Sequence, residues 1–488
     1  MTGPALIYNL FPPLVGSIPK WEGHLERIAG MGFTWIFLNP IHTPGLSGSL
    51  YAVKDYFGIN PLFYPESGGD PEAALVHFLR EAERRGLRVM LDLVINHTAI
   101  DSPLVRAHPE WYVRDEAGQV KHPGAIDPAD ATRVTVWGDL AELEYWPLPD
   151  PVGLLAYFRG VLAKYLQLGF RGFRADAAYK IPGDFWAELI NGAKAAQPEA
   201  EFFAETLGCR LEQCAQLSSA GFDFLYNSSK WWDFQADWCL EQYNTFRHVA
   251  PSISFPESHD TERLAAASHG AVEVARQRYL FAAYFSAGVM IPVGFEYGFQ
   301  KHLNVVETRP QDWETPTYDL TSFIRGANRM KKGCPVLLEE GPQVRVNPEG
   351  EPVVLMLKSR ASRRGRVLAV INTTREEQLL VLDDFSIVNG CSECDKRIDC
   401  LAHPDLKCAW DDITPDEIPR KLRPGTEIDL PPSKMRIFYC PEGLPLPDIG
   451  GEHEDYAGAQ TPCVMQEIEA KKLPKIPAAH TQVRPYKT

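Results

Sequence analysis

Between residue 5 and about residue 325, short β-rich apolar runs alternate regularly with longer helical patterns, and few folds are compatible with this pattern. Several of these runs are apolar on both faces, as strands buried inside a parallel sheet must be. Eight strands are predicted, at residues 5–8, 35–38, 88–94, 172–175, 201–204, 222–225, 253–255 and 289–291. Eight alternating units predict a (β/α)8 barrel, although periodicity alone also fits an open parallel sheet.

The helical patterns between the strands support this prediction. Residues 71–85 carry Ala74, Leu75, Phe78, Leu79 and Ala82 at helical spacing, and a glycine follows as a stop signal. A second helix is predicted over residues 182–196, which open with Pro-Gly-Asp. Both segments have one apolar face, which suits helices that cover the outside of a barrel.

Two further regions complete the predicted domain organisation. The connection after the third strand, residues 97–150, is too long for a structureless loop and predicts a small inserted subdomain within a barrel domain at residues 1–330. Residues 331–445 show short strands separated by turn residues, which predicts an all-β sandwich. Residues 446–488 are rich in proline, glycine and charge, and we expect an extended or disordered tail.

The net charge of −15 narrows the classes of partner. Nucleic acids and anionic membranes attract basic surfaces, so we expect neither as a main partner. No run approaches the ~18 apolar residues of a membrane span. The N-terminus lacks the basic and apolar segments of a signal peptide. The sequence therefore predicts a cytoplasmic protein.

Polar residues follow the ends of several predicted strands, where a barrel places its active site. A single carboxylate at such a position most often caps a helix. Carboxylates at several strand ends together are harder to explain as caps, and they favour a catalytic rim. The residues are Asp92, Asn96 and His97 at and beyond the end of the third strand, Arg174 and Asp176 at the end of the fourth, Glu205 at the end of the fifth, and Glu257, His259 and Asp260 after the seventh.

These segments resemble the signature regions of the α-amylase superfamily, glycoside hydrolase family 13. The strongest matches are Gly-Phe-Arg-Ala-Asp-Ala-Ala at residues 172–178, Phe-Ala-Glu at 203–205 and Ser-His-Asp at 258–260, in the family's order. Residues 51–56, 92–97 and 138–142 give weaker matches. The resemblance covers residues 5 to about 330, and a β-sandwich after the barrel is also the family's arrangement.

The resemblance implies a retaining, two-step reaction on α-1,4-glucosidic bonds. Asp176 is expected to be the nucleophile that forms a covalent glycosyl intermediate. Glu205 is expected to act first as acid and then as base, with the two carboxyl groups ~5–5.5 Å apart. Asp260 is expected to bind sugar hydroxyls and to favour the distorted, cationic transition state.

Five further residues are predicted to bind substrate. Arg174 lies two residues before Asp176 on the same strand face, where it can keep that carboxylate charged. The resemblance implies that His97 and His259 hydrogen-bond sugar hydroxyls and that Tyr51 stacks on the sugar, although a core aromatic also explains Tyr51. Typical α-amylases grip the acceptor side with Lys-His three and four residues after the nucleophile, whereas this chain has Tyr179 and Lys180, which argues against ordinary endo-amylase action. Lys180 could instead help to hold a phosphate group, and a solvated lysine at a helix start is the alternative interpretation.

The sequence also contains two candidate metal sites. Asn96 matches a calcium ligand of many amylases, but the insert is short and Glu142 stands where an aspartate is common, so calcium stays open. No cofactor is expected to be required. Cys391, Cys394, Cys400 and Cys408 could hold a structural zinc ion as four thiolates, since the first pair has zinc-knuckle spacing. The later spacings are irregular, which leaves disulfides or separate thiols as alternatives.

The resemblance does not choose one reaction, because this family runs several on one barrel. Residues 38–44 and 108–112 resemble the bacterial maltosyltransferases that use maltose 1-phosphate. Those enzymes have Asn directly after the nucleophile, whereas this chain has Ala177. The main interpretation is therefore an α-glucan-active glycosidase or transglycosylase, with maltosyl transfer as the first alternative. A catalytically inactive, amylase-like binding subunit is the second, although all three carboxylates are present.

Overall fold

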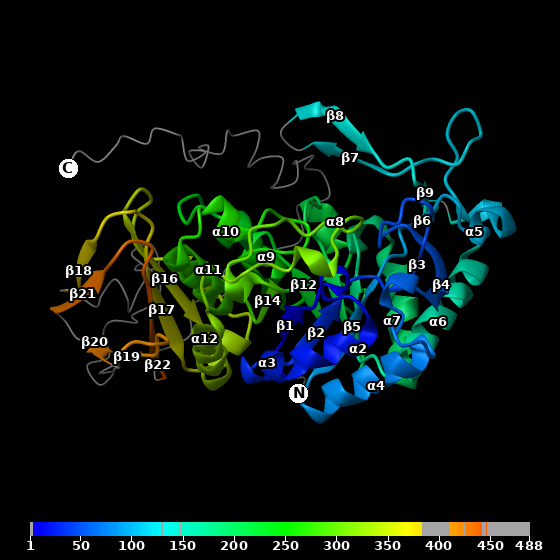
Figure 1. The fold of residues 1–488 in the computed structure, drawn as a ribbon. Helices are drawn as coiled ribbons and strands as arrows, with labels where there is room; N and C mark the ends of the chain where they lie inside the picture. Colours follow the sequence, from blue (N-terminus) through cyan, green and yellow to red (C-terminus); the bar gives the residue numbers. More distant parts are fainter. Residues whose placement is uncertain are drawn as a thin grey trace.

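The computed structural model describes residues 3–127, 130–146, 148–382, 410–418, 420–422, 425–441 and 446. Its eight predicted strands close into a parallel barrel, because β1 pairs with β14 on one side and with β2 on the other (Figure 1). The barrel prediction is confirmed, and an open sheet is excluded. In chain order the strands are β1 (Leu6–Asn9), β2 (Trp35–Leu38), β5 (Arg88–Leu93), β10 (Gly172–Ala175), β11 (Glu201–Glu205), β12 (Phe224–Tyr226), β13 (Ser252–Ser254) and β14 (Gly288–Pro292).

Alternate side chains of these strands enter two separate apolar clusters. Ile7, Phe37, Met90 and Phe203 belong to a cluster that fills the barrel. Their strand neighbours belong to a larger cluster shared with the surrounding helices. This division explains why the strands are apolar on both faces and why the site must form at a barrel end.

The predicted helices match the structure to within one residue at each end. Helix α4 (Pro71–Arg84) is capped by Asp70, whose side chain accepts a hydrogen bond from the Glu72 amide. Helix α7 (Gly183–Ala196) buries Phe185, Trp186, Leu189 and Ile190. Among the described residues, no helix combines the length and the apolar composition needed to cross a membrane.

The connection after β5 has secondary structure of its own, as predicted. Strand β6 (His97–Ala99) pairs with β9 (Leu140–Glu142), and between them lie α5 (Pro103–Ala107) and a hairpin of β7 (Gly124–Asp127) and β8 (Asp130–Val136). The hairpin projects away from the body of the barrel (Figure 1). This insert therefore adds a wall beside one part of the barrel mouth.

The part of the C-terminal region that the structure describes is all β, as predicted. A six-stranded sheet runs β15 (Gln343–Arg345), β16 (Val353–Ser359), β17 (Arg366–Asn372), β22 (Met435–Cys440), β19 (Trp410–Asp412) and β20 (Lys421–Leu422), while β18 (Gln378–Leu382) pairs with β21 (Thr426–Leu430). Strands β19 and β20 were not predicted. The cluster of Cys391, Cys394, Cys400 and Cys408 lies outside the described residues, as does nearly all of the predicted tail. The zinc site and the domain limits therefore stay predictions.

A buried polar cluster joins this sheet to the barrel end opposite the site. Lys331, near the end of α12 (Thr321–Gly333), donates to the backbone oxygens of Ala283 at 2.9 Å, Ser286 at 2.6 Å and Leu337 at 2.5 Å. Lys358 of β16 donates to the Phe285 oxygen at 2.9 Å. Lys331 and Lys358 are 0% exposed. We call these two lysines and their carbonyl partners the basal cluster; it satisfies backbone oxygens where α11 (Val272–Phe285) ends.

Candidate functional site

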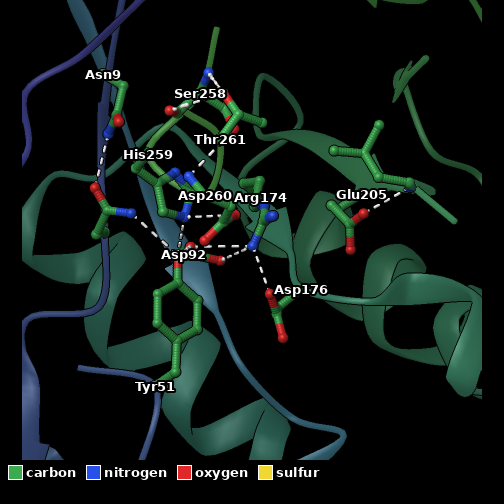
Figure 2. A network of polar contacts seen from close by, with 12 residues as sticks. Asn9, Tyr51, Asp92, Arg174, Asp176, Glu205, Ser258, His259, Asp260 and Thr261 are labelled. Carbon is green, nitrogen blue, oxygen red and sulfur yellow. Dashed lines mark hydrogen bonds and ion pairs between the residues drawn. The ribbon is translucent and has the colours of Figure 1, made fainter. Parts of the chain in front are cut away.

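The polar residues that follow the barrel strands meet at its C-terminal end. Asp92 is the fifth residue of β5, Arg174 the third residue of β10, and Asp176 follows β10 directly. Glu205 ends β11, and the loop after β13 carries Asp260. Because these strands are parallel, their carboxyl ends lie on one rim, where the structure joins most of these side chains in one network (Figure 2).

Arg174 is the centre of this network. Its Nη1 donates to Asp176 Oδ1 at 2.7 Å and to both oxygens of Asp92 at 3.0 and 3.1 Å. Arg174 is 4% exposed and Asp92 is fully buried. Burial raises the pKa of Asp92 to about 6, although the Arg174 charge acts in the opposite direction. The guanidinium thus holds the Asp176 carboxylate in place through a hydrogen bond.

Tyr51 and His259 extend the network away from Arg174. The Tyr51 hydroxyl donates to Asp92 Oδ2 at 2.7 Å and lies 2.6 Å from His259 Nε2. The two rings stack, with their centroids 5.8 Å apart and their planes 6° apart. His259 Nε2 also lies 3.0 Å from Asp260 Oδ2. His259 is buried, whereas the Asp260 side chain is 53% exposed, so its carboxylate can reach a ligand at the barrel mouth.

Two asparagines that the sequence analysis missed support Tyr51. Asn39 Nδ2 donates to the Tyr51 hydroxyl at 3.0 Å, and Asn9 Nδ2 donates to Asn39 Oδ1 at 2.8 Å. Both asparagines are fully buried. Asn9 ends β1 and Asn39 follows β2, so the rule that found the carboxylates, polar residues at strand ends, could also have found this pair.

Glu205 has no hydrogen bond to this network, but it lies on the same rim, on the side of Asp176 (Figure 2). Its Oε2 accepts from the Ala177 amide at 2.9 Å, and its Oε1 accepts from the Leu207 amide at 2.6 Å. Ala177 has a φ of 42°, in the left-handed region that is uncommon for alanine. Burial raises the pKa of Glu205 to about 7, and the nearby Asp176 charge acts in the same direction. A carboxyl group with this pKa can exchange a proton near neutral pH.

The remaining predicted residues lie at the side of the insert. His97 Nε2 lies 3.1 Å from the Tyr51 backbone oxygen, and burial lowers the pKa of His97. Lys180 ends the short 3-10 helix η4 (Ala178–Lys180), four residues after Asp176. Within the described residues its ammonium group has no hydrogen-bond or ion-pair partner. The structure therefore places His97 beside the network and leaves Lys180 outside it.

A buried ion pair holds the loop that carries His259 and Asp260. Arg263 Nη1 lies 2.8 Å from Glu257 Oε1, and both side chains are 1% exposed. Arg263 Nη2 donates to the Val293 oxygen after β14 at 2.7 Å, while Glu257 Oε2 accepts from the Leu264 amide at 2.5 Å. The pair ties both ends of the loop to the neighbouring strand end, so it positions Asp260 without being placed to touch a substrate.

The described residues around Asn96 offer little to a calcium ion. Asn96 Oδ1 is buried without a hydrogen-bond partner there, which is the one observation in favour of a ligand. Glu142, however, forms an ion pair of 3.1 Å with Lys121. No group of three or more His, Cys, Asp or Glu side chains with metal-binding geometry occurs among the described residues. We therefore assign no chemical step to a metal.

Comparisons with known proteins identify relatives whose names describe action on glucans. Residues 6–121 match a family described as the glucanotransferase domain of glycogen debranching enzyme. The chain is 28% identical over 369 residues to an alpha-1,4-glucan:maltose-1-phosphate maltosyltransferase of Burkholderia pseudomallei, which covers 73% of this chain and 32% of that protein. It is 26% identical to the maltosyltransferase 1 of Streptomyces coelicolor, over 91% of this chain and 68% of the relative. This chain thus spans about one third of the Burkholderia relative.

Solved structures show the same fold. The alpha-amylase of Lactobacillus plantarum superposes with a TM-score of 0.68 at 22% identity, over 89% of this chain and 98% of that one. A Geobacillus thermoleovorans alpha-amylase, solved with acarbose, gives a TM-score of 0.67 at 17% identity, over 90% and 99% of the two chains. With its closed barrel and its C-terminal β domain, the chain has the fold of these amylases, and in sequence it is similar to alpha-1,4-glucan:maltose-1-phosphate maltosyltransferases.

Proposed function

We propose that this protein is a retaining enzyme that cleaves or transfers α-1,4-glucosidic bonds. One observation carries the proposal: a buried carboxyl group, Glu205, with a pKa of about 7, lies beside a carboxylate, Asp176, that Arg174 fixes and neutralises. Two carboxyl groups in different environments can divide the acid and nucleophile roles between them. The similarity to glucan-active relatives supports the choice of substrate.

In the proposed first step, Asp176 attacks the anomeric carbon of the glycosyl unit. Glu205 donates its proton to the oxygen of the leaving sugar, and the bond between that oxygen and the anomeric carbon breaks. In the second step, Glu205 takes the proton of an incoming hydroxyl, whose oxygen replaces Asp176 on the anomeric carbon. Water as the acceptor gives hydrolysis, and a sugar hydroxyl gives transfer.

The network around Tyr51 is proposed to bind the glycosyl unit itself. Asp260 is exposed at the barrel mouth, and His259 holds it on the side opposite Glu205. Its charge can stabilise the positive charge that develops at the anomeric carbon. Tyr51 has its hydroxyl bound by Asp92 and His259, so only its ring face is left for the stacking contact that we expect with the sugar.

Transfer of maltosyl units from maltose 1-phosphate is the second candidate. The similarity to enzymes of that name over 73% and 91% of this chain favours it. Ala177 brings no polar side chain to the position after Asp176, so a phosphate group would have to be held by other residues. The cytoplasmic location inferred from the sequence stays a prediction.

A product analysis distinguishes these reactions. The protein is incubated with maltoheptaose, with and without maltose 1-phosphate, and products are separated by chain length. Reducing sugar from maltoheptaose alone indicates hydrolysis, and a ladder of longer chains indicates transfer. Phosphate release that requires maltose 1-phosphate selects the maltosyltransferase. No product under either condition contradicts the proposed function and favours a binding subunit.

A further inference from the structure

An open pocket of about 720 Å³ lies between the insert and the segments that follow β10 and β11. Its walls come from the segments around β7, β8 and β9, from η4, and from the residues that begin α8 (Leu211–Ala215). The side chains that matter here are Lys121, Glu142, Trp146, Tyr179, Lys180 and Arg210. None of these walls belongs to the network around Tyr51.

The described lining of this pocket is positively charged, in a protein whose net charge is −15. Its lysine and arginine side chains are Lys121, Lys180 and Arg210, and its one carboxylate is Glu142. Glu142 is already paired with Lys121 at 3.1 Å. Among the described residues, the side chains of Lys180 and Arg210 have no ion-pair or hydrogen-bond partner. The pocket therefore offers two uncompensated cations to a ligand.

The same pocket is larger than a small inorganic anion would fill, and aromatic side chains form part of its wall. Trp146 is 64% exposed, which is unusual for so large an apolar side chain, and Tyr179 stands beside Lys180. Aromatic rings at a site can stack on the apolar faces of a sugar. Cations and aromatic rings on one wall together fit a sugar that carries an anionic group.

Two walls of the pocket follow the proposed catalytic carboxyl groups in the chain. Lys180 follows Asp176 by four residues, and Arg210 follows Glu205 by five. The pocket lining includes none of Tyr51, Asp92, His259 and Asp260, the residues proposed to bind the glycosyl unit. A separate pocket attached to both carboxyl-bearing segments suits an acceptor next to the donor.

We propose that this pocket binds a sugar phosphate as the acceptor, with Lys180 and Arg210 pairing with its phosphate group. The inference rests on the proposed glycosyl transfer. In the transfer step, Glu205 takes the proton of an acceptor hydroxyl, the acceptor oxygen bonds to the anomeric carbon, and the bond to Asp176 breaks. The phosphate group stays intact and only positions the acceptor, so no further reactant is needed.

Calorimetric titration of the full chain tests the binding without any turnover. Glucose 6-phosphate is expected to bind at least tenfold more tightly than glucose or inorganic phosphate, with an affinity that falls as salt rises. Lys180→Gln and Arg210→Gln are each expected to lower the affinity for glucose 6-phosphate about tenfold or more, since each removes a charge-assisted contact. Lys332→Gln, the same change at the opposite end of the barrel, is the matched control and is expected to bind normally.

Equal affinities for glucose and glucose 6-phosphate overturn the inference, because Lys180 and Arg210 then make no favourable contact with the phosphate group. Equal affinities for inorganic phosphate and glucose 6-phosphate also overturn it, because the sugar then plays no part. Mass spectrometry of maltoheptaose incubated with glucose 6-phosphate is expected to show phosphorylated oligosaccharides. Normal turnover of maltoheptaose without such products refutes the acceptor role alone, whereas the absence of all turnover refutes the proposed function and leaves the titration result standing.

Discussion

Both ends of this barrel bury charged side chains, but the buried groups have different partners at the two ends. At the C-terminal end, Arg174 is shared by two carboxylates, and Asp176 and Asp260 keep part of their surface exposed. At the opposite end, the basal cluster surrounds Lys331 and Lys358 with backbone oxygens and exposes nothing. The first arrangement holds charge ready for a ligand, whereas the second uses charge to complete backbone hydrogen bonding.

This contrast teaches that burial of a charged residue does not by itself mark a site. Under the proposed function, a change at the rim should lower activity with little loss of stability, because Asp176 and Asp260 keep part of their surface exposed for a substrate. The basal cluster should show the reverse. Separate measurements of turnover and of the free energy of unfolding can therefore test this difference between the two barrel ends.

The largest effect is expected for Asp176→Asn. The amide keeps the size of the side chain but cannot form the glycosyl ester, so turnover of maltoheptaose should fall by a factor on the order of 10⁴ or more. The midpoint of thermal unfolding should stay within a few degrees of the wild-type value. Residual activity above about one per cent in a carefully purified variant would remove Asp176 from the nucleophile role.

The next effect concerns stability. Lys331→Met leaves three buried carbonyl oxygens without their hydrogen-bond donor. The free energy of unfolding in urea should therefore fall by about 3 kcal/mol or more, while turnover per folded molecule is unchanged. Lys332→Met, an exposed neighbour on the same helix, is the control and should change it by less than about 0.5 kcal/mol. If both variants unfold alike, the basal cluster is not a source of stability.

A smaller effect on activity is expected at the ion pair that holds the loop. Glu257→Gln leaves Arg263 buried without its countercharge and loosens the position of Asp260. Misplacement of a catalytic group can cost up to about 10²-fold, and a fall of about tenfold to 10²-fold in kcat with little change in KM is expected. Steady-state kinetics beside thermal unfolding separate the roles: a lower midpoint with an unchanged kcat would leave the pair purely structural.

The barrel and its carboxylates could be predicted because each rests on local sequence. A strand buried on both faces is apolar at most positions. Asp176 directly follows such a run, Glu205 ends one, and Asp260 lies in the loop six residues after the end of β13. Neighbouring parallel strands then bring residues from distant parts of the chain to one rim. The strand limits differed from the structure by at most two residues at either end.

The features that were missed depend on contacts that local sequence does not encode. Lys331 lies in the last turn of a helix, where a lysine is normally solvated, and its burial depends on backbone oxygens of Ala283, Ser286 and Leu337 that the fold brings around it. Strands β19 and β20 have three and two residues, too few for a recognisable alternation. The pocket at Lys180 is assembled from the insert and from segments after two strands, so no single segment reveals it.

The smallest effect tests the acid role of Glu205 through pH. Burial raises the pKa of Glu205 to about 7, and the proposed first step needs its protonated form. The value of kcat/KM for maltoheptaose should therefore be constant below that pKa and fall by about tenfold per pH unit above it, because the free enzyme then loses the proton that it must donate.

Maltosyl fluoride provides the control for this pH dependence, since fluoride leaves without a proton. With this donor, the decline of kcat/KM above pH 7 should disappear, and Glu205→Gln should react with it far faster than with maltoheptaose. An alkaline decline of equal steepness with both donors would show that another group titrates. The acid role would then have to be assigned elsewhere on the rim, where Asp92, also buried and with its pKa raised to about 6, is already bound by Arg174 and Tyr51 and is poorly placed to donate.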